Sequence, residues 1–283
     1  RGLKMKLLIN KKAVFNSELI TDAAKQWSRD NWQYLTETDT PLINVSSSAK
    51  TKKGKGYAIG ILYLKPADTI TKKTLCAAAK LYGCKKDCLE SSGQLGMKTG
   101  DNAKIKRTIL FALERARFEQ CLKIEINRHY QKHGDKLRIR LNGTSDINWQ
   151  SFIASMSHIS FYDYTKIISY IKKNNLNNYH LTFSGSANNA RTIKHTAAAI
   201  NGGLNTVIAI NTAETKGEYK RPKTLDRIAL IDMDKTDYRF DDIAGAVGTL
   251  KRKGSNKKAR AIDEKRENFF FNVNTLNKLA ALL

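Results

Sequence analysis

Short runs rich in apolar and β-branched residues recur along the middle of the chain. They cover residues 57–64, 137–142, 159–164, 179–184, 206–211 and 227–232. Helix-forming stretches lie between the second and the fifth run, at residues 148–156, 165–174 and 189–200. Strands that alternate with helices form a parallel sheet with right-handed crossovers. The pattern therefore predicts an α/β fold, either a partial (β/α)6 barrel or an open parallel sheet, with the helices outside the sheet.

Two helical segments lie outside this alternation. Residues 18–35 are amphipathic, and residues 103–132 carry apolar side chains at three- and four-residue steps, which predicts a long helix that Gly134 ends. The chain is therefore predicted to have three parts: an N-terminal preface with a basic loop (1–56), a β/α core with a cysteine loop (57–248) and a basic C-terminal extension (249–283).

The charge of the chain is strongly positive. Its 283 residues include 50 Lys and Arg but only 26 Asp and Glu, a net charge of +24, while the apolar share of 41% is that of an ordinary globular protein. So basic a surface favours a polyanionic partner, with nucleic acid the first candidate and an acidic membrane surface the second. Two basic segments are predicted to bind phosphates: a flexible loop at residues 46–56, and residues 249–268, for which a solvated face is the alternative. Their candidate residues are Lys52, Lys53, Lys55, Lys251, Arg252, Lys253, Lys257, Lys258 and Arg260.

Several classes of protein are disfavoured. No apolar run approaches the ~20 residues that cross a bilayer, and the apolar patch near residue 8 is too short and broken for a secretory signal. Four cysteines in a chain of this length do not form a disulfide scaffold. We therefore expect a soluble protein of a reducing, cytoplasmic compartment.

Three of the cysteines are close together, directly after the first β-prone run. Cys76, Cys84 and Cys88 have the spacing C-x7-C-x3-C, and thiolates gathered in this way hold zinc or an iron–sulfur cluster. A structural zinc site would need a fourth ligand, such as Cys121 or a histidine. Three thiolates suit a [4Fe–4S] cluster with one open iron. Inert thiols are the alternative, and Cys121 is expected to be a core residue.

Polar residues gather where the predicted strands end, which is where parallel β/α folds bind their ligands. The candidates are Asn142, Ser145, Asp146, Tyr164, Lys166, His180 and Ser184. Helix capping is the alternative role for Ser145 or Asp146. Sheet packing is the alternative for Tyr164 and His180. Taken together, the candidates predict a binding site at the carboxyl edge of the sheet.

Four segments resemble, in the same order, the bacteriophage gene-product-88 family. They are RLNGTSDI (140–147), FYDYTK (161–166), YHLTFS (179–184) and IDMDKTDYRF (231–240). Members of that family similarly carry a three-cysteine segment upstream and a glycine-rich basic stretch like residues 245–254 downstream. The resemblance covers roughly residues 57–254. It implies a phage or mobile-element origin, and hence the cytoplasm of an infected bacterium, but it supplies no reaction.

A first hypothesis is an iron–sulfur enzyme that acts on nucleic acid or a nucleotide. Its architecture resembles that of radical S-adenosylmethionine enzymes, although their usual cysteine spacing is C-x3-C-x2-C. Cys76, Cys84 and Cys88 would hold the cluster. The cofactor S-adenosylmethionine would be bound by Asn142, Ser145, Asp146, His180 and Ser184. The catalytic candidates facing the substrate are Tyr164, Lys166 and Asp146.

Two alternatives remain open. One is a non-redox protein of phage replication or host takeover that binds nucleic acid, with zinc or no metal at the cysteines. The other is a Mg²⁺-dependent nuclease that uses the carboxylates of Asp146, Asp163, Asp232 and Asp234. No phosphate-binding GxxxxGK[ST] loop is present in the sequence.

Overall fold

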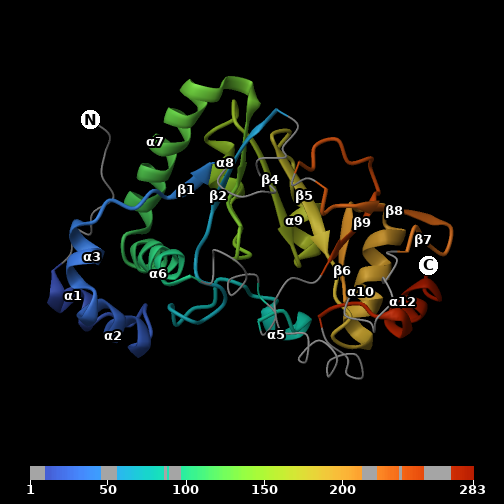
Figure 1. Cartoon of the computed structure of the whole chain (residues 1–283), viewed down its shortest axis with the longest axis horizontal. Coiled ribbons are helices and arrows are strands. Elements are labelled where there is room, and N and C mark those ends of the chain that lie inside the picture. Colours follow the sequence, from blue (N-terminus) through green and yellow to red (C-terminus); the bar gives the residue numbers. More distant parts are fainter. Residues whose placement is uncertain are drawn as a thin grey trace. The chain divides into compact units, whose positions relative to one another are not determined.

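The computed structural model describes residues 10–45, 56–85, 88, 97–211, 222–235, 238–251 and 269–283 (Figure 1). Its strands are β1 (Ile43–Val45), β2 (Ala58–Leu62), β3 (Leu137–Arg140), β4 (Ser160–Thr165), β5 (Tyr179–Ser184), β6 (Thr206–Ile210), β7 (Thr224–Leu225), β8 (Ile228–Asp232) and β9 (Val247–Lys251). They form an open, mostly parallel sheet in the order β1-β2-β3-β4-β5-β6-β9-β8-β7. The α/β prediction is confirmed, and of its two versions the open sheet is the correct one.

All six predicted strands are present, as β2, β3, β4, β5, β6 and β8. The sequence pattern did not reveal β9, which pairs in parallel with both β6 and β8 and so separates two strands that were predicted to be consecutive. This strand crosses position 248, where the predicted core ends and the basic extension begins. The strand begins with Val247-Gly248, and because glycine is typical of turns, the sequence pattern does not indicate a strand here.

The chain divides into two compact units. Unit 1 comprises Arg1–Ser47, Tyr57–Ala77 and Cys88–Phe161, and unit 2 comprises Ser48–Gly56, Ala78–Asp87 and Tyr162–Leu283. Neither unit is a single continuous segment, because the cysteine region and the preface contribute to both.

In unit 1, β1 pairs antiparallel with β2, and β2 pairs in parallel with β3. The helices of this unit are α1 (Lys11–Phe15), α2 (Asp22–Asp30), α3 (Trp32–Glu37), α6 (Lys98–Leu113), α7 (Arg115–His133) and α8 (Gln150–Ala154). The predicted helix at 103–132 is thus two helices, because Glu114 leaves the helical region with φ −132° and ψ 51°. As predicted, Gly134 ends the second helix, with a positive φ of 53°.

Helix α6 buries cations as well as apolar side chains. Ile105 and Ile109 face the core as their spacing predicts, but Lys104, Lys106 and Arg107 are buried too. The Lys106 ammonium donates to the backbone oxygens of Tyr34 (2.8 Å) and Thr38. Buried charges require such partners, and residues of the preface supply them here.

In unit 2, β5, β6, β9 and β8 run parallel, and β7 pairs antiparallel with β8. The helices of this unit are α5 (Ala79–Tyr82), α9 (Ile168–Lys172), α10 (Ala190–Asn201) and α12 (Val273–Ala280). They cover one face of its strands: α10 and α12 pack on Ile208 and Ile210, while α5, α9 and α10 surround Phe183.

The other face of these strands carries the alternate side chains. Ser184 of β5 is paired with Val207 of β6. Because side chains alternate along a strand, the same face bears Thr182, two positions before Ser184, and Ala209 and Asn211, two and four positions after Val207. Tyr162 and His180 share this face as well, because both rings contact Phe240, with centroids 5.8 Å apart in each case. Across the described ranges, we find no helix long and apolar enough to cross a membrane.

Candidate functional site

Cys76 lies beside the turn that follows β3. Its backbone forms a parallel bridge with Asp146, whose amide donates to the Leu75 oxygen at 2.9 Å. The thiol accepts from the amide of Ala67 at 3.3 Å and donates to the Thr144 oxygen at 3.9 Å. The structure therefore brings the first cysteine and the predicted Asn142–Asp146 turn together within unit 1.

The amide of Asn142 holds that turn in place. Its Oδ1 accepts from Ser145 Oγ (2.9 Å), the Ile147 amide (3.0 Å) and Trp149 Nε1 (3.3 Å), and its Nδ2 donates to the Ile147 oxygen (3.0 Å). Asn142 and Ser145 are buried. Neither Ser145 nor Asp146 caps α8, whose N-cap residue is Trp149. The polar atoms of Asn142 are thus engaged within the turn itself.

The other cysteines are distributed differently. Cys84 belongs to unit 2, where its thiol lies 4.0 Å from the Ala79 oxygen, and Cys88 is a half-buried residue of unit 1. Cys121 is buried in α7, and burial raises the pKa of its thiol. Within the described part of the chain, no three His, Cys, Asp or Glu side chains are grouped so as to hold a metal ion. Metal binding by Cys76, Cys84 and Cys88 stays a prediction.

In unit 2, Lys166 and Ser184 meet at the carboxyl ends of β4 and β5. Lys166 Nζ donates to Ser184 Oγ at 2.8 Å and lies 3.4 Å from the Ser184 oxygen. The same ammonium lies 4.4 Å from the ring centre of Phe269 and 5.8 Å from that of Tyr82. Aromatic faces attract cations, so this arrangement holds a positive charge at the edge where the sequence predicts a site.

Two buried polar side chains on the same face were not predicted. Thr182 is fully buried and Asn211 is 3% exposed, and neither side chain has a hydrogen-bond partner among the described residues. Asn211 is the first residue after β6, so the rule that selected Ser184 would also have found it. Thr182 gave no such signal, because threonine is common within strands.

His180 does not join Lys166 and Ser184. It lies near the amino end of β5, about 13 Å along the strand from Ser184 at ~3.3 Å per residue. Its Nε2 is 3.4 Å from Asn205 Nδ2. Burial, and then the nearby charge of Arg239, lower the pKa of His180. Tyr164, half-buried, follows Tyr162 by two positions and therefore faces the same side of β4.

The four aspartates considered as magnesium ligands have separate partners. The buried Asp163 accepts from the Tyr179 hydroxyl at 3.0 Å. Asp232 accepts from the amide of Asp234 at 2.9 Å, and Asp234 accepts from the amide of Lys251 at 2.7 Å. Asp146 belongs to unit 1, whereas the other three belong to unit 2.

The helices that cover unit 2 carry cations without carboxylates. Residues 164–213 contain no Asp or Glu, and neither do α5 and α12. Five exposed cations on α5, α9 and α10, or directly after α9, make no ion pair with any described residue. We call them the basic face: Lys80, Lys172, Lys173, Arg191 and Lys194.

Of the predicted basic loops, the structure describes only Lys251, which is exposed at the end of β9. The remaining residues of those loops lie outside the described ranges: Lys52, Lys53, Lys55, Arg252, Lys253, Lys257, Lys258 and Arg260. The basic face is therefore a set of cations that the sequence analysis did not select. The absence of acidic residues over 164–213 is the signal that could have found it.

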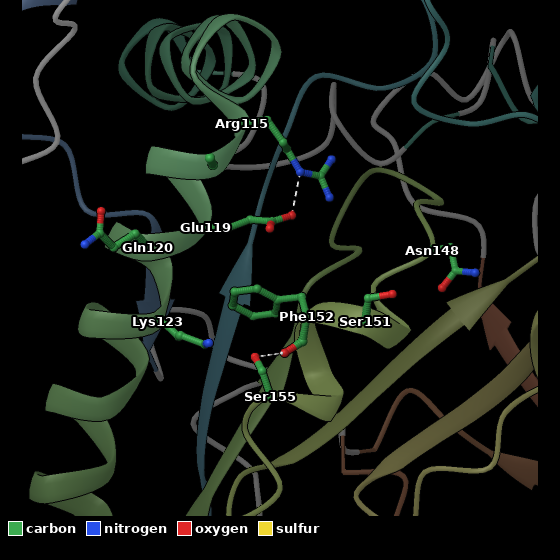
Figure 2. Close-up of a pocket in the computed structure, with 9 residues that line it drawn as sticks. Arg115, Glu119, Gln120, Lys123, Asn148, Ser151, Phe152 and Ser155 are labelled. Atoms are coloured by element: carbon green, nitrogen blue, oxygen red, sulfur yellow. Dashed lines mark hydrogen bonds and ion pairs between the residues drawn. The ribbon is translucent and has the colours of Figure 1, made fainter.

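Unit 1 contains a pocket of about 520 Å³ between α7 and α8 (Figure 2). Its lining residues are Arg115, Ala116, Glu119, Gln120, Lys123, Asn148, Ser151, Phe152 and Ser155. Arg115 forms an ion pair with Glu119, and Ser155 Oγ donates to the Phe152 oxygen at 2.6 Å. None of these residues was among the sequence-based candidates.

A family model described as gene product 88 matches residues 34–266, which is more than half of the chain. No curated protein and no solved structure matches it. The matched range includes all four segments on which the sequence resemblance rests. The chain therefore belongs to the gene product 88 family, the bacteriophage family that its sequence resembles.

Proposed function

We propose that this protein binds the phosphate backbone of nucleic acid, in the cytoplasm of an infected bacterium, through the basic face of unit 2. The observation that carries the proposal is the run of residues 164–213, which supplies four of the five cations of that face and no acidic side chain. A helical surface of a soluble protein commonly mixes charges of both signs. A surface that lacks the negative charges attracts polyanions.

The composition of the basic face favours nucleic acid over a lipid surface. An interfacial helix needs exposed aromatic or aliphatic side chains to enter the headgroup region. The exposed neighbours of the cations on α9 and α10 are small or polar, such as Ser169, Ala190 and Asn201. Among the described residues, no large exposed apolar side chain lies on α5, α9 or α10.

The test is the salt dependence of binding to labelled DNA and RNA oligonucleotides, measured by fluorescence anisotropy. Each neutralised phosphate contributes about 0.7–0.9 to the slope of log K against log salt. If most of the basic face takes part, we expect a slope of about −3 to −4. Absence of binding at low salt, or an affinity that salt leaves unchanged, would refute the proposal. Binding only to anionic vesicles would assign the basic face to membranes instead.

A second candidate function concerns the cysteines. We propose that Cys76, Cys84 and Cys88 hold an iron–sulfur cluster of the kind that binds S-adenosylmethionine. It is supported by the position of Cys76, whose backbone pairs with the turn that follows a parallel strand. Soft thiolates suit such a cluster. Protein purified without oxygen should be brown and contain about four iron and four sulfide ions per chain. Zinc in place of iron, or no metal, would exclude the cluster.

A further inference from the structure

We propose that the pocket between α7 and α8 receives one unpaired base of a single-stranded nucleic acid, stacked on the guanidinium of Arg115. The inference rests on the proposed function, because it names the form of nucleic acid that is bound. It concerns residues of unit 1 that do not belong to the basic face.

Arg115 offers a fixed, planar surface. Its guanidinium carbon lies 4.0 Å from the ring centre of Phe111 and 4.8 Å from that of Trp149, and its Nε is bound by Glu119. Both rings are buried, and neither lines the pocket, whereas Arg115 does. Arg115 thus contacts both rings and also lines the pocket. Its side chain is 44% exposed, so a surface remains open to a ligand.

Unpaired bases stack on arginine planes as well as on aromatic rings. A base placed here would stack on a guanidinium that already contacts the rings of Phe111 and Trp149. Because Glu119 and the two rings immobilise the guanidinium before the ligand arrives, little conformational entropy is lost on binding. Base stacking of this kind is worth about 1–3 kcal/mol per base.

The rest of the lining suits a nucleotide. Ser151 and Ser155 present exposed hydroxyls, which can bond to the edge of a base. Lys123, which also lines the pocket, supplies a cation for the phosphate. Figure 2 shows Arg115, Gln120 and Lys123 on α7, with Ser151 and Phe152 across the pocket on α8. The volume of about 520 Å³ is within the range of small-ligand sites, ~300–1,000 Å³.

The pocket should distinguish single strands from duplexes, because only an unpaired base can offer its whole face for stacking. In a duplex each base is already stacked between its neighbours, and only its edges are accessible. In a single strand the base can leave the stack at low cost. We therefore expect the pocket to contribute to single-strand affinity and to leave duplex affinity unchanged.

The experiment compares a labelled single-stranded oligonucleotide with a hairpin duplex, using the full chain and the variant Arg115→Lys. Lysine keeps the charge but lacks the plane, so single-strand affinity should fall about ten-fold while duplex affinity stays constant. The control is Arg128→Lys on the same helix, an exposed position that does not line the pocket, and it should change neither affinity.

A second variant controls for the possibility that Arg115→Lys loses affinity because it no longer folds. Ala116→Leu adds bulk to the pocket at an exposed helix position and removes no contact, so it should weaken single-strand binding with an unchanged melting temperature. Equal losses for single strand and duplex in Arg115→Lys, or no loss in both variants, would overturn the inference while leaving the basic face intact. No binding of any nucleic acid would overturn the proposed function as well.

Discussion

The two units use their charged residues in different ways. In unit 1 the structure describes ion pairs that neutralise some of the cations locally: Lys25–Asp22, Lys65–Asp101, Lys104–Asp101, Arg115–Glu119 and Arg117–Glu114. In unit 2 the described pair is Arg239–Asp242, while the five cations of the basic face have no described carboxylate partner. Surface pairs of the first kind contribute little to stability. They reduce the positive field of unit 1 only locally, because exposed cations such as Lys72, Lys73 and Arg128 have no described ion pair there either. What distinguishes the basic face of unit 2 is that residues 164–213 contain no acidic side chain.

Buried polar groups do not divide the two units in the same way. In unit 1, Asn142 makes four hydrogen bonds and the Lys106 ammonium donates to two backbone oxygens. In unit 2, the side chains of Thr182 and Asn211 have no hydrogen-bond partner among the described residues. A buried polar group without a partner costs about 1–3 kcal/mol. The hydroxyl of Thr40 in unit 1 is likewise buried without a partner among the described residues, so such groups occur in both units.

The largest expected effect concerns how much the exposed cations of each unit contribute to nucleic-acid affinity. Replacing Lys172, Lys173, Arg191 and Lys194 of the basic face together with glutamine should lower nucleic-acid affinity about a thousand-fold at ~0.1 M salt. The reason is that each phosphate contact accounts for about 0.7–0.9 log units at that salt concentration. Fluorescence anisotropy over a salt series measures both the affinity and the slope, which should become shallower by about 3.

The matched control replaces four exposed cations of unit 1, again three lysines and one arginine. They are Lys72, Lys73, Lys98 and Arg128. This variant has the same net charge as the first, so it tests whether the location of the charge matters. If both variants lose affinity equally, the basic face is no special site and the comparison between the units fails.

Much of the fold followed from the sequence because each predicted strand is a short apolar run between turn residues. All six such runs are strands, and Gly134 ends α7. The edge strands β1 and β7 were missed because they have only three and two residues, too few for a period to show. Alternation along the chain also cannot place β9, since its position between β6 and β8 is a property of the sheet and not of local sequence.

The candidate site was predictable only in part. Strand-end polarity identified Lys166 and Ser184, which are in contact, but it also selected His180 at the opposite end of β5. Helical periodicity could not reveal that Lys106 is buried, because the backbone oxygens that bind it come from residues about 70 positions earlier. Partners so distant in sequence leave no local pattern. For the same reason, the pocket between α7 and α8 could not be inferred.

Single lysine substitutions should distinguish buried from exposed cations. Lys106→Ala should lower the free energy of unfolding by about 3 kcal/mol, since it removes two charge-assisted hydrogen bonds from the core of unit 1. Lys194→Ala, on the basic face, should change it by less than about 0.5 kcal/mol. Urea unfolding followed by circular dichroism measures both values. A stable Lys106→Ala protein would mean that the preface does not depend on this ammonium.

The buried amides provide the next comparison. Asn142→Leu should destabilise the protein by about 2–3 kcal/mol, because the partners of its four hydrogen bonds lose them. Asn211→Leu should be neutral or stabilising, since an apolar group of similar size replaces an unpartnered amide. Thermal unfolding in the absence of ligand tests the pair. A comparable loss in Asn211→Leu would show that this amide is satisfied within the folded protein.

The smallest effect concerns the histidines whose pKa is lowered, one in each unit. Burial is the main cause for both; the charges of His133, Lys132 and Arg128 also lower the pKa of His129, and Arg239 that of His180. Since the unfolded chain binds these protons more tightly, the free energy of unfolding should fall as the pH drops below ~6.5 and through the folded pKa. Salt screens the exposed Lys132 and Arg128 more than the buried Arg239.

These causes predict how two substitutions should differ. His180→Gln should reduce the pH dependence by a similar amount at low and at high salt, because burial is the main cause of its pKa shift. The effect of His129→Gln should shrink as salt is raised, because part of its pKa shift comes from exposed charges. Melting temperatures measured between about pH 5 and 8 at two salt concentrations provide the test. If salt reduced both effects equally, the charges that act on His180 would be screened as strongly as those that act on His129. The two units would then not differ in how their charges act on a histidine.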